Sequence, residues 1–246
     1  MPRLEDLKIR IFADGADYDS LMELSRKPYI KGFTTNPTLM RKANVSDYEA
    51  FARKVLASIQ DRPVSFEVFA DDFAEMRAQA LEIATWGPNV NVKIPVTNTR
   101  AEFAGELIRE LSGEGVVLNV TAVFTPEQVR RIAAALNPNV AAIVSVFAGR
   151  IADSGVDPVP IMRECRSILA SLPHAQLLWA SPREVLNLFQ ADQCGCDIVT
   201  VTSDILCKLA NIGKPLDQFS LETVQMFYKD ASAASYTIAT KSAARF

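Results

Sequence analysis

The chain has 246 residues, of which 49% are hydrophobic and 22% are charged, as in an ordinary globular protein with a large core. The formal net charge is −3 and no basic block stands out, so neither nucleic acid nor an anionic membrane is expected as the main partner. The N-terminal residues do not resemble a signal peptide, and no apolar stretch is long enough to cross a bilayer, so a cytoplasmic location is expected.

Eight short apolar runs are expected to form strands, and several are rich enough in Val and Ile to be covered on both faces. Amphipathic stretches separate them, and no long linker interrupts the series. This alternation predicts a single (β/α)8 TIM barrel over residues 1–246. A doubly wound open sheet is the alternative, but no Gly-x-Gly-x-x-Gly follows the first run. The runs are Ile9–Asp14, Gly32–Asn36, Val64–Val68, Val90–Pro95, Val116–Thr121, Ala141–Phe147, Gln176–Ser181 and Asp197–Thr202.

Sequence patterns typical of helix N-termini, such as capping boxes and Pro at the first helical position, occur between several of these runs. An extra helix is expected at the C-terminus, from about residue 220. Its apolar stripe, which contains Leu221, Val224 and Phe227, is expected to pack on the barrel or on a neighbouring subunit. The candidate N-caps of the other helices are Ser46, Asp71 or Asp72, Thr97 or Asn98, Thr125 and Ser181.

The sequence offers little for a metal site or a Ser-His-Asp triad. Cys194-Gly195-Cys196 has the wrong spacing for a zinc knuckle, and His174 is the single histidine of the chain. No metal ion is expected, and the four cysteines are expected to be reduced thiols.

Lys93 stands in an otherwise apolar run, between Val92 and Ile94. Burying an ammonium group is costly unless the group is paired or loses its proton. A neutral buried amine is a nucleophile toward carbonyl groups. The alternative is a lysine that reaches solvent or forms a salt bridge at the end of a strand.

Alternation along the strands gives Lys93 polar neighbours. Residues two apart share a face of a strand, so one face of several runs carries polar groups near its C-terminal end. In a barrel these side chains meet at the mouth where barrel enzymes have their active sites. A buried Lys93–Glu67 ion pair kept for structure is the alternative. The polar residues of these faces and strand ends are Asp14, Asn36, Ser65, Glu67, Asn91, Lys93, Asn119, Thr121, Ser145, Ser181 and Thr202.

An amine, two carboxylates and small polar groups together favour Schiff-base chemistry. The amine attacks a ketone or aldehyde, and the protonated imine withdraws electrons, so that a neighbouring C–C bond breaks or forms without a metal. Glu67 suits the proton transfers of imine formation, and Asp14 suits removal of a proton from a substrate hydroxyl. Alternatively, Asp14 is a turn residue in Ala13-Asp14-Gly15.

A phosphate site is expected beside these groups. Arg150 follows the sixth run, and Ser181 and Arg183 follow the seventh, where a helix N-terminus and Arg side chains can bind an anion. The alternatives are that Ser181 is a plain N-cap, that Arg150 pairs with Asp153, and that Arg183 pairs with solvent or with a nearby acid.

In its motifs the chain resembles the transaldolase family, from Ile11 to about Leu209. The strand-like lysine and the Thr-Thr-Asn-Pro segment are specific in combination. The motifs are Phe12-Ala13-Asp14, Gly32-Phe33-Thr34-Thr35-Asn36-Pro37-Thr38, Val64-Ser65-Phe66-Glu67-Val68, Asn91-Val92-Lys93-Ile94-Pro95-Val96-Thr97, Leu118-Asn119-Val120-Thr121, Phe147-Ala148-Gly149-Arg150 and Asp197-Ile198-Val199-Thr200-Val201.

The resemblance implies a role for each candidate residue. Lys93 would form a Schiff base with a ketose phosphate, and Asp14 would be the base for C–C cleavage. Glu67 and Thr121 would hold the water that relays protons. The resemblance implies transfer of dihydroxyacetone from sedoheptulose 7-phosphate to glyceraldehyde 3-phosphate, without a cofactor. Sugar hydroxyls would be bound by Asn36, Asn119 and Ser145, and the phosphate by Arg150, Ser181 and Arg183.

The family also contains fructose 6-phosphate aldolases, which release dihydroxyacetone. They carry Gln and Tyr where this chain has Glu67 and Phe147. Because a Phe cannot protonate the enamine, transfer is favoured over release. A sugar-phosphate-binding barrel without catalysis, in which Lys93 is only ion-paired, is the third possibility. Gly15 and Ser203-Asp204 depart from the usual residues of the family and leave the substrate preference open.

The resemblance also bears on assembly. Members of this family often form rings built on pentamers, and the rings use the C-terminal helix. A homo-oligomer, as a pentamer or decamer, is therefore expected.

Overall fold

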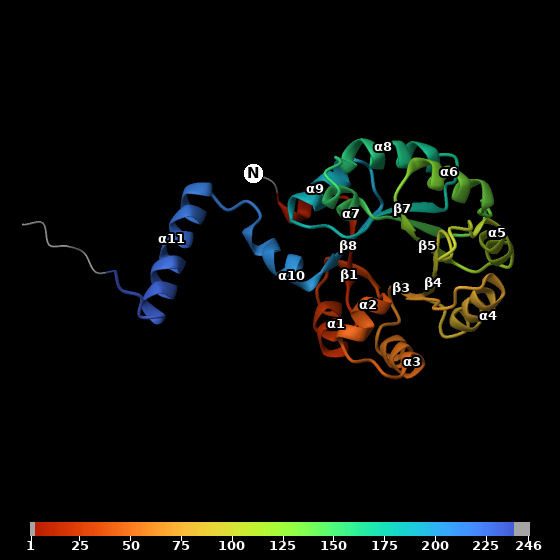
Figure 1. The fold of residues 1–246 in the computed structure, drawn as a ribbon, viewed down its shortest axis with the longest axis horizontal. Coiled ribbons are helices and arrows are strands. Elements are labelled where there is room, and N and C mark those ends of the chain that lie inside the picture. The colour runs from red at the N-terminus through yellow and green to blue at the C-terminus, as the bar shows by residue number, and fades with distance from the viewer. Residues whose placement is uncertain (1–2, 239–246) are drawn as a thin grey trace, which may run out of the picture.

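The computed structural model describes residues 3–238. Eight parallel strands pair in sequence order, and β8 pairs with β1 to close a barrel, which Figure 1 shows. This closure confirms the TIM barrel and excludes the open sheet. The strands are β1 (Arg10–Asp14), β2 (Ile30–Thr34), β3 (Val64–Glu67), β4 (Val90–Pro95), β5 (Leu118–Val123), β6 (Ala142–Val146), β7 (Ala175–Trp179) and β8 (Ile198–Thr202).

Helices surround the barrel (Figure 1). Two of them, α2 and α7, are short and begin directly after a strand, ahead of the longer helix of the same repeat. They therefore place residues of the chain at the C-terminal mouth of the barrel. The helices are α1 (Tyr18–Ser25), α2 (Pro37–Lys42), α3 (Tyr48–Ser58), α4 (Phe73–Ala84), α5 (Gly105–Gly113), α6 (Pro126–Ala135), α7 (Ala148–Asp153), α8 (Pro158–Leu169), α9 (Leu186–Gln193), α10 (Ser203–Leu206) and α11 (Leu216–Ala233), with 3-10 turns at Leu4–Asp6 and Cys207–Asn211.

Two of the predicted N-caps are confirmed. The Asp72 carboxylate accepts backbone N–H groups at the start of α4, and Thr125 forms a capping box with Gln128 at the start of α6. The prediction for α3 was wrong by one residue. Its cap is Asp47 and not Ser46, because the Asp47 carboxylate takes the N–H of Ala50.

Two other predicted caps were wrong. Helix α5 begins only at Gly105, because the chain first folds back in a bridge between Thr97 and Phe103, and the Asn98 side chain accepts N–H groups of that loop. Helix α9 begins at Leu186, well after Ser181. Ser181 itself has φ 58°, a left-handed conformation, so it belongs to the loop after β7.

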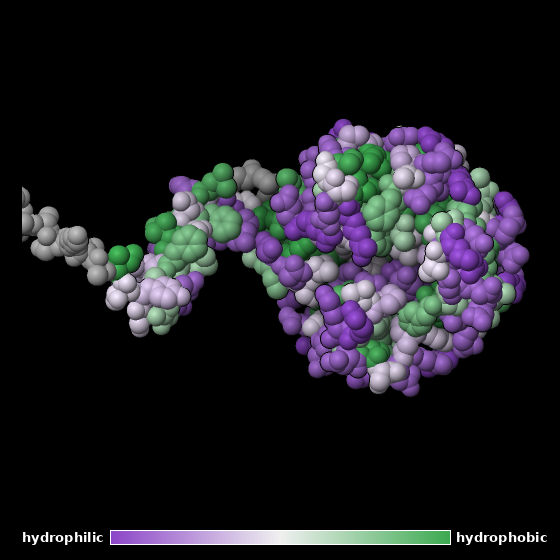
Figure 2. Space-filling model, in the orientation of Figure 1, coloured by the Kyte–Doolittle hydropathy of each residue, from purple (hydrophilic) through white to green (hydrophobic). Residues whose placement is uncertain are grey.

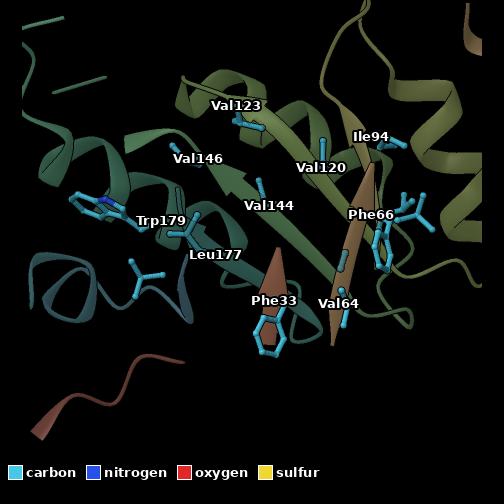
Figure 3. Packing of buried hydrophobic residues seen from close by; sticks show 14 of the residues in the cluster. Phe33, Val64, Phe66, Ile94, Val120, Val123, Val144, Val146, Leu177 and Trp179 are labelled. Carbon is cyan, nitrogen blue, oxygen red and sulfur yellow. The ribbon is translucent and has the colours of Figure 1, made fainter. Parts of the chain in front are cut away.

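The core has an outer layer between the strands and the helices, which Figure 3 shows in part. A second, inner cluster fills the lower part of the barrel lumen. Gly32 of β2 makes room for it, because a Cβ at Gly32 would lie 2.5 Å from the Phe12 ring. The lumen is thus apolar below and has space for polar groups above. The inner cluster consists of Phe12, Ile143, Leu178, Ala180 and Ile198, with Phe147 packed against it.

The C-terminal helix α11 stands away from the barrel (Figure 1). It begins at Leu216, somewhat earlier than expected, and none of its residues is buried. Its apolar side chains, visible as green atoms in Figure 2, include Leu221, Val224 and Phe227, which are at least 50% exposed. Of the two contacts expected for this stripe, packing on the barrel is therefore excluded, and packing on a neighbouring subunit stays a prediction. Within residues 3–238, no helix combines the length and the apolar character needed to cross a membrane.

Candidate active site

Lys93 lies on β4 and is buried, with 6% of its surface exposed. Its Nζ donates a hydrogen bond to the backbone carbonyl of Thr35 at 2.7 Å and lies 3.0 Å from Oε2 of Glu67. Glu67 is the register partner of Lys93 on the neighbouring strand β3. The two acceptors explain how an ammonium group tolerates this position. Lys93 does not extend to solvent, and its ion pair with Glu67 faces the lumen.

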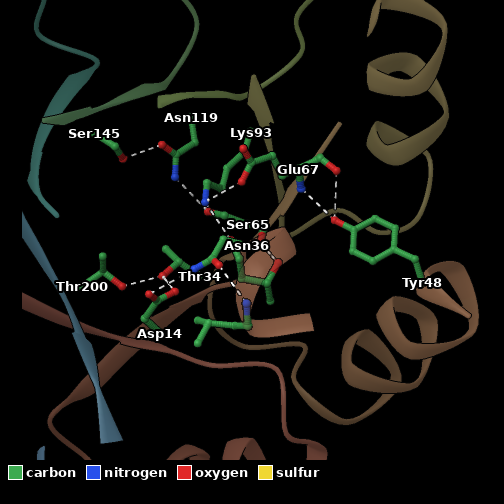
Figure 4. A network of polar contacts seen from close by, with 12 residues as sticks. Asp14, Thr34, Asn36, Tyr48, Ser65, Glu67, Lys93, Asn119, Ser145 and Thr200 are labelled. Carbon is green, nitrogen blue, oxygen red and sulfur yellow. Dashed lines mark hydrogen bonds and ion pairs between the residues drawn. The ribbon is translucent and has the colours of Figure 1, made fainter. Parts of the chain in front are cut away.

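Asp14 ends β1 and faces the same lumen (Figure 4). Its carboxylate accepts hydrogen bonds from Thr34 Oγ1 at 2.8 Å and from Asn36 Nδ2 at 3.4 Å, and the Thr34 hydroxyl also bonds that of Thr200. Burial raises the pKa of Asp14, against the opposing effects of the Lys93 charge and the Thr34 hydrogen bond. A raised pKa brings a carboxyl group closer to the range in which it exchanges protons at neutral pH. The alternative of a plain turn residue was wrong.

A chain of hydrogen bonds fixes the polar groups of the next strands (Figure 4). Ser145 Oγ donates to Asn119 Oδ1 at 2.6 Å, and Asn119 Nδ2 donates to Ser65 Oγ at 3.1 Å. The orientation of the Asn119 amide is therefore determined. Thr121 Oγ1 is buried and has no hydrogen-bond partner within residues 3–238, although Thr121 lines the same space as Lys93.

Close backbone packing builds the opposite side of the mouth. The N–H of Gly149 donates to the carbonyl of Ala180 at 3.2 Å, and a Cβ at Gly149 would lie 1.5 Å from the carbonyl oxygen of Ser181. Only glycine lets the first turn of α7 approach the left-handed residue Ser181 this closely. This contact sets the position of the loop that follows β7.

Two arginines lie at this corner. The Arg183 guanidinium forms a two-pronged ion pair with Asp153, in which Nε lies 3.0 Å from Oδ1. Arg150 packs on the Phe147 ring, with Cζ 5.1 Å from the ring centroid. The alternative pairing of Arg183 with a nearby acid is confirmed. The alternative pairing of Arg150 with Asp153, and the N-cap role of Ser181, were wrong.

All the predicted site residues line one cavity of about 410 Å³ at the C-terminal mouth of the barrel. This volume is typical of sites for small metabolites. Three other polar residues expected at the mouth, Ser65, Asn91 and Thr202, do not line it. The Thr202 hydroxyl bonds Asp204 at 2.5 Å instead, because the chain turns into α10 there. The predicted residues that the cavity brings together are Asp14, Asn36, Glu67, Lys93, Asn119, Thr121, Ser145, Phe147, Arg150, Ser181 and Arg183.

Several residues of this site are not among those predicted from the sequence. Thr34 and Thr200 line the cavity and lie two residues before Asn36 and Thr202, so the alternation of the strands could have found them. Lys42 on α2 also lines the cavity, but no strand pattern points to it. No group of three or more His, Cys, Asp or Glu side chains in the described part of the chain is arranged to hold a metal ion.

Comparison with known proteins decides the family. Residues 11–243 match the family model described as Transaldolase/Fructose-6-phosphate aldolase. The chain belongs to this family. A probable transaldolase of Dehalococcoides mccartyi is 39% identical over 202 residues, which are 82% of this chain and 90% of that protein. A probable transaldolase of Nitrosopumilus maritimus is 32% identical over 224 residues, 90% of this chain and 94% of its own. The resemblance inferred from the motifs is thus confirmed.

A comparison of structures supports the fold of this transaldolase-family enzyme. The crystal structure of a dihydrodipicolinate synthase from Rhodopseudomonas palustris aligns with a TM-score of 0.56, over 91% of this chain and 79% of that one. Because the two sequences are only 17% identical, this likeness concerns the fold alone.

Proposed function

We propose that the protein is a transaldolase that moves a dihydroxyacetone unit between sugar phosphates through a Schiff base on Lys93. The donor would be sedoheptulose 7-phosphate and the acceptor glyceraldehyde 3-phosphate, with erythrose 4-phosphate and fructose 6-phosphate as products. The observation that carries the proposal is the meeting of an amine with two carboxylates in one cavity. Lys93 Nζ lies 3.0 Å from Glu67, and Asp14 lines the same space.

The reaction would begin with attack of the Lys93 amine on the ketone carbon of the donor. Loss of water from the carbinolamine gives a protonated imine, and Glu67 with the free Thr121 hydroxyl would hold the water that moves these protons. Asp14 would then take the proton of the hydroxyl on the carbon beyond the breaking bond. The C–C bond breaks, the aldose phosphate leaves, and an enamine stays on Lys93 until an acceptor aldehyde restores the bond.

The remaining residues of the cavity would bind the substrate. Asn36 would bind sugar hydroxyls, as would Asn119 and Ser145, whose mutual hydrogen bond fixes their orientation. Arg150, Ser181 and Arg183 would bind the phosphate at the corner that Gly149 opens.

Phe147 favours transfer over release of dihydroxyacetone. Its side chain lines the cavity but offers no proton for the enamine carbon. A fructose 6-phosphate aldolase is the second candidate, since it would use the same lysine. A barrel that binds sugar phosphates without catalysis is the third, since a Lys93–Glu67 ion pair can also be structural.

Reductive trapping tests the proposal. The protein is incubated with fructose 6-phosphate and borohydride, and the modified residue is mapped by mass spectrometry. We expect the adduct on Lys93, with turnover of donor only when an acceptor aldehyde is present. Lys42, which also lines the cavity, is the internal control. An adduct on Lys42, or none, would contradict the assignment, and rapid release of free dihydroxyacetone would favour the aldolase.

We also propose that the protein is a homo-oligomer whose subunits meet through α11. The support is the exposed apolar stripe of this helix, since a helix that stands in water with Val224 and Phe227 more than half exposed gains stability when a partner covers it. A ring built on pentamers is the arrangement expected from the family.

A further inference from the structure

The hydrogen-bond ladder between β2 and β3 breaks next to Lys93. Its regular part ends with the N–H of Thr35, which donates to the carbonyl of Ser65 at 3.2 Å. In a parallel ladder, the following bond runs from the N–H of the residue two beyond Ser65 to the carbonyl of Thr35. That residue is Glu67. The bond is not formed, because the N–H of Glu67 points elsewhere.

The hydroxyl of Tyr48 replaces the Thr35 carbonyl as the hydrogen-bond acceptor for the N–H of Glu67. It accepts the N–H of Glu67 at 2.7 Å and lies 3.1 Å from the carbonyl of the same residue, to which it donates (Figure 4). One side chain from α3 thus satisfies both backbone groups of Glu67. The carbonyl of Thr35 therefore receives no hydrogen bond from the N–H of Glu67. Instead, Lys93 Nζ donates a hydrogen bond to it at 2.7 Å.

Packing holds the Tyr48 hydroxyl at this point. Its ring makes edge contacts with Phe66, Phe69 and Trp86, with centroids 6.1, 4.5 and 5.7 Å away. Burial raises the pKa of Tyr48 well above its ordinary value, so the phenol stays protonated and remains a donor. The side chain therefore has a fixed position and a fixed protonation state.

We propose that Tyr48 is a positioning residue for the Schiff-base lysine. By replacing β2 as the partner of Glu67, its hydroxyl keeps the Thr35 carbonyl available to Lys93 and fixes the carboxylate beside the amine. Without the hydroxyl, the N–H of Glu67 loses its acceptor and competes with Lys93 for the Thr35 carbonyl. The Lys93 side chain then loses one of its two protein partners. The inference rests on the proposed function of Lys93.

The test is the substitution Tyr48→Phe, which keeps the ring and removes only the hydroxyl. We expect kcat for transfer from fructose 6-phosphate to fall by about tenfold, the effect of one lost positioning hydrogen bond. KM is expected to stay within about twofold, because the proposed phosphate ligands lie elsewhere, Arg150 on α7 and Arg183 on the loop after β7. Rates are divided by the fraction of sites that borohydride traps at saturating substrate, so that unfolded protein does not count.

The matched control is Tyr18→Phe. It removes a 2.9 Å hydrogen bond between the hydroxyls of Tyr18 on α1 and Ser58 at the end of α3, and neither residue lines the cavity. It is expected to leave kcat unchanged. A double-mutant cycle with Glu67→Gln adds a readout that a purely structural role would not move, since the effect of Tyr48→Phe is expected to shrink in that background. An unchanged kcat in Tyr48→Phe, or full additivity with Glu67→Gln, would overturn the inference. A wild-type protein without turnover or adduct would instead overturn the proposed function.

Discussion

Asp14 is a carboxyl group that burial holds against ionisation. The folded protein therefore keeps a proton on Asp14 at pH values where the unfolded chain has released it. Above the ordinary pKa of 3.8, this difference lowers the stability of the folded state as the pH rises. Asp14, the proposed base, thus lowers the stability of the folded protein at pH values above its ordinary pKa.

Replacing Asp14 by Asn separates these two effects. We expect Asp14→Asn to lower turnover by about 100-fold or more, because the proton acceptor is lost. The same change is expected to raise the melting temperature at neutral pH, and this gain is expected to disappear below pH 3.8, where both states hold the proton. Steady-state kinetics and thermal melts across pH check both parts. A gain in stability that does not vary with pH would contradict the role of burial.

Phe147 offers a second test at the same scale. We expect Phe147→Tyr to convert part of the transfer activity into release of dihydroxyacetone, because a phenol at this position can protonate the enamine. The release rate without acceptor is expected to rise by about tenfold or more over that of the wild type. The measurement is free dihydroxyacetone in the absence of an aldehyde. Phe124, whose ring centroid lies 5.8 Å from that of Phe147, provides the control Phe124→Tyr. Equal release by both variants would show that the position does not matter.

At the scale of elements, the corner between β6 and β7 depends on how closely α7 can approach. Gly149 touches the backbone of Ser181, so the site there is shaped by the lack of a side chain. Through Asp153 at its last residue, the same helix also holds Arg183. One short helix therefore positions both arginines proposed to bind phosphate.

The substitution Gly149→Ala is expected to push α7 away from the loop after β7. We expect KM for fructose 6-phosphate to rise by about tenfold or more, while any activity with unphosphorylated dihydroxyacetone donors changes less. The control is Gly113→Ala at the end of α5, where a Cβ meets no atom within 4 Å and stability is expected to hold or improve. If Gly149→Ala lowered activity equally with phosphorylated and unphosphorylated substrates, the substitution would not act through the phosphate site.

The sequence was sufficient for the elements that a local pattern governs. Alternation along the strands placed Lys93 and Glu67 side by side, and Thr125 marked the start of α6. It failed where the backbone leaves regular geometry. Ser181 has the sequence of an N-cap, but the contact with Gly149 places it in a loop. The role of Tyr48 could not be predicted, because it depends on a break in the ladder between two strands to which Tyr48 does not belong.

At the scale of the whole molecule, α11 is the part of the structure that the barrel leaves uncovered. We expect the double substitution Val224→Asp, Phe227→Asp to dissociate the protein into monomers, because charges in an apolar contact oppose association. Gln225→Asp on the same helix, which is also exposed, is the control and is expected to leave the assembly intact. Light scattering coupled to size exclusion gives the mass. A wild-type monomer, or a double variant that still assembles, would contradict the role of α11.

The Phe12 ring, which packs against Gly32, has a further consequence for the proposed transfer between two sugars. With Ile143 and Leu178 it seals the lower lumen of the described barrel, so a ligand reaches Lys93 from the C-terminal mouth. In the proposed transferase, donor and acceptor would use this one entrance in turn, and the first aldose phosphate would depart before the acceptor enters. An excess of acceptor would bind to the free enzyme and compete with the donor. Because the packed Phe12 ring closes the barrel below the active site, donor and acceptor would bind one after the other and not together.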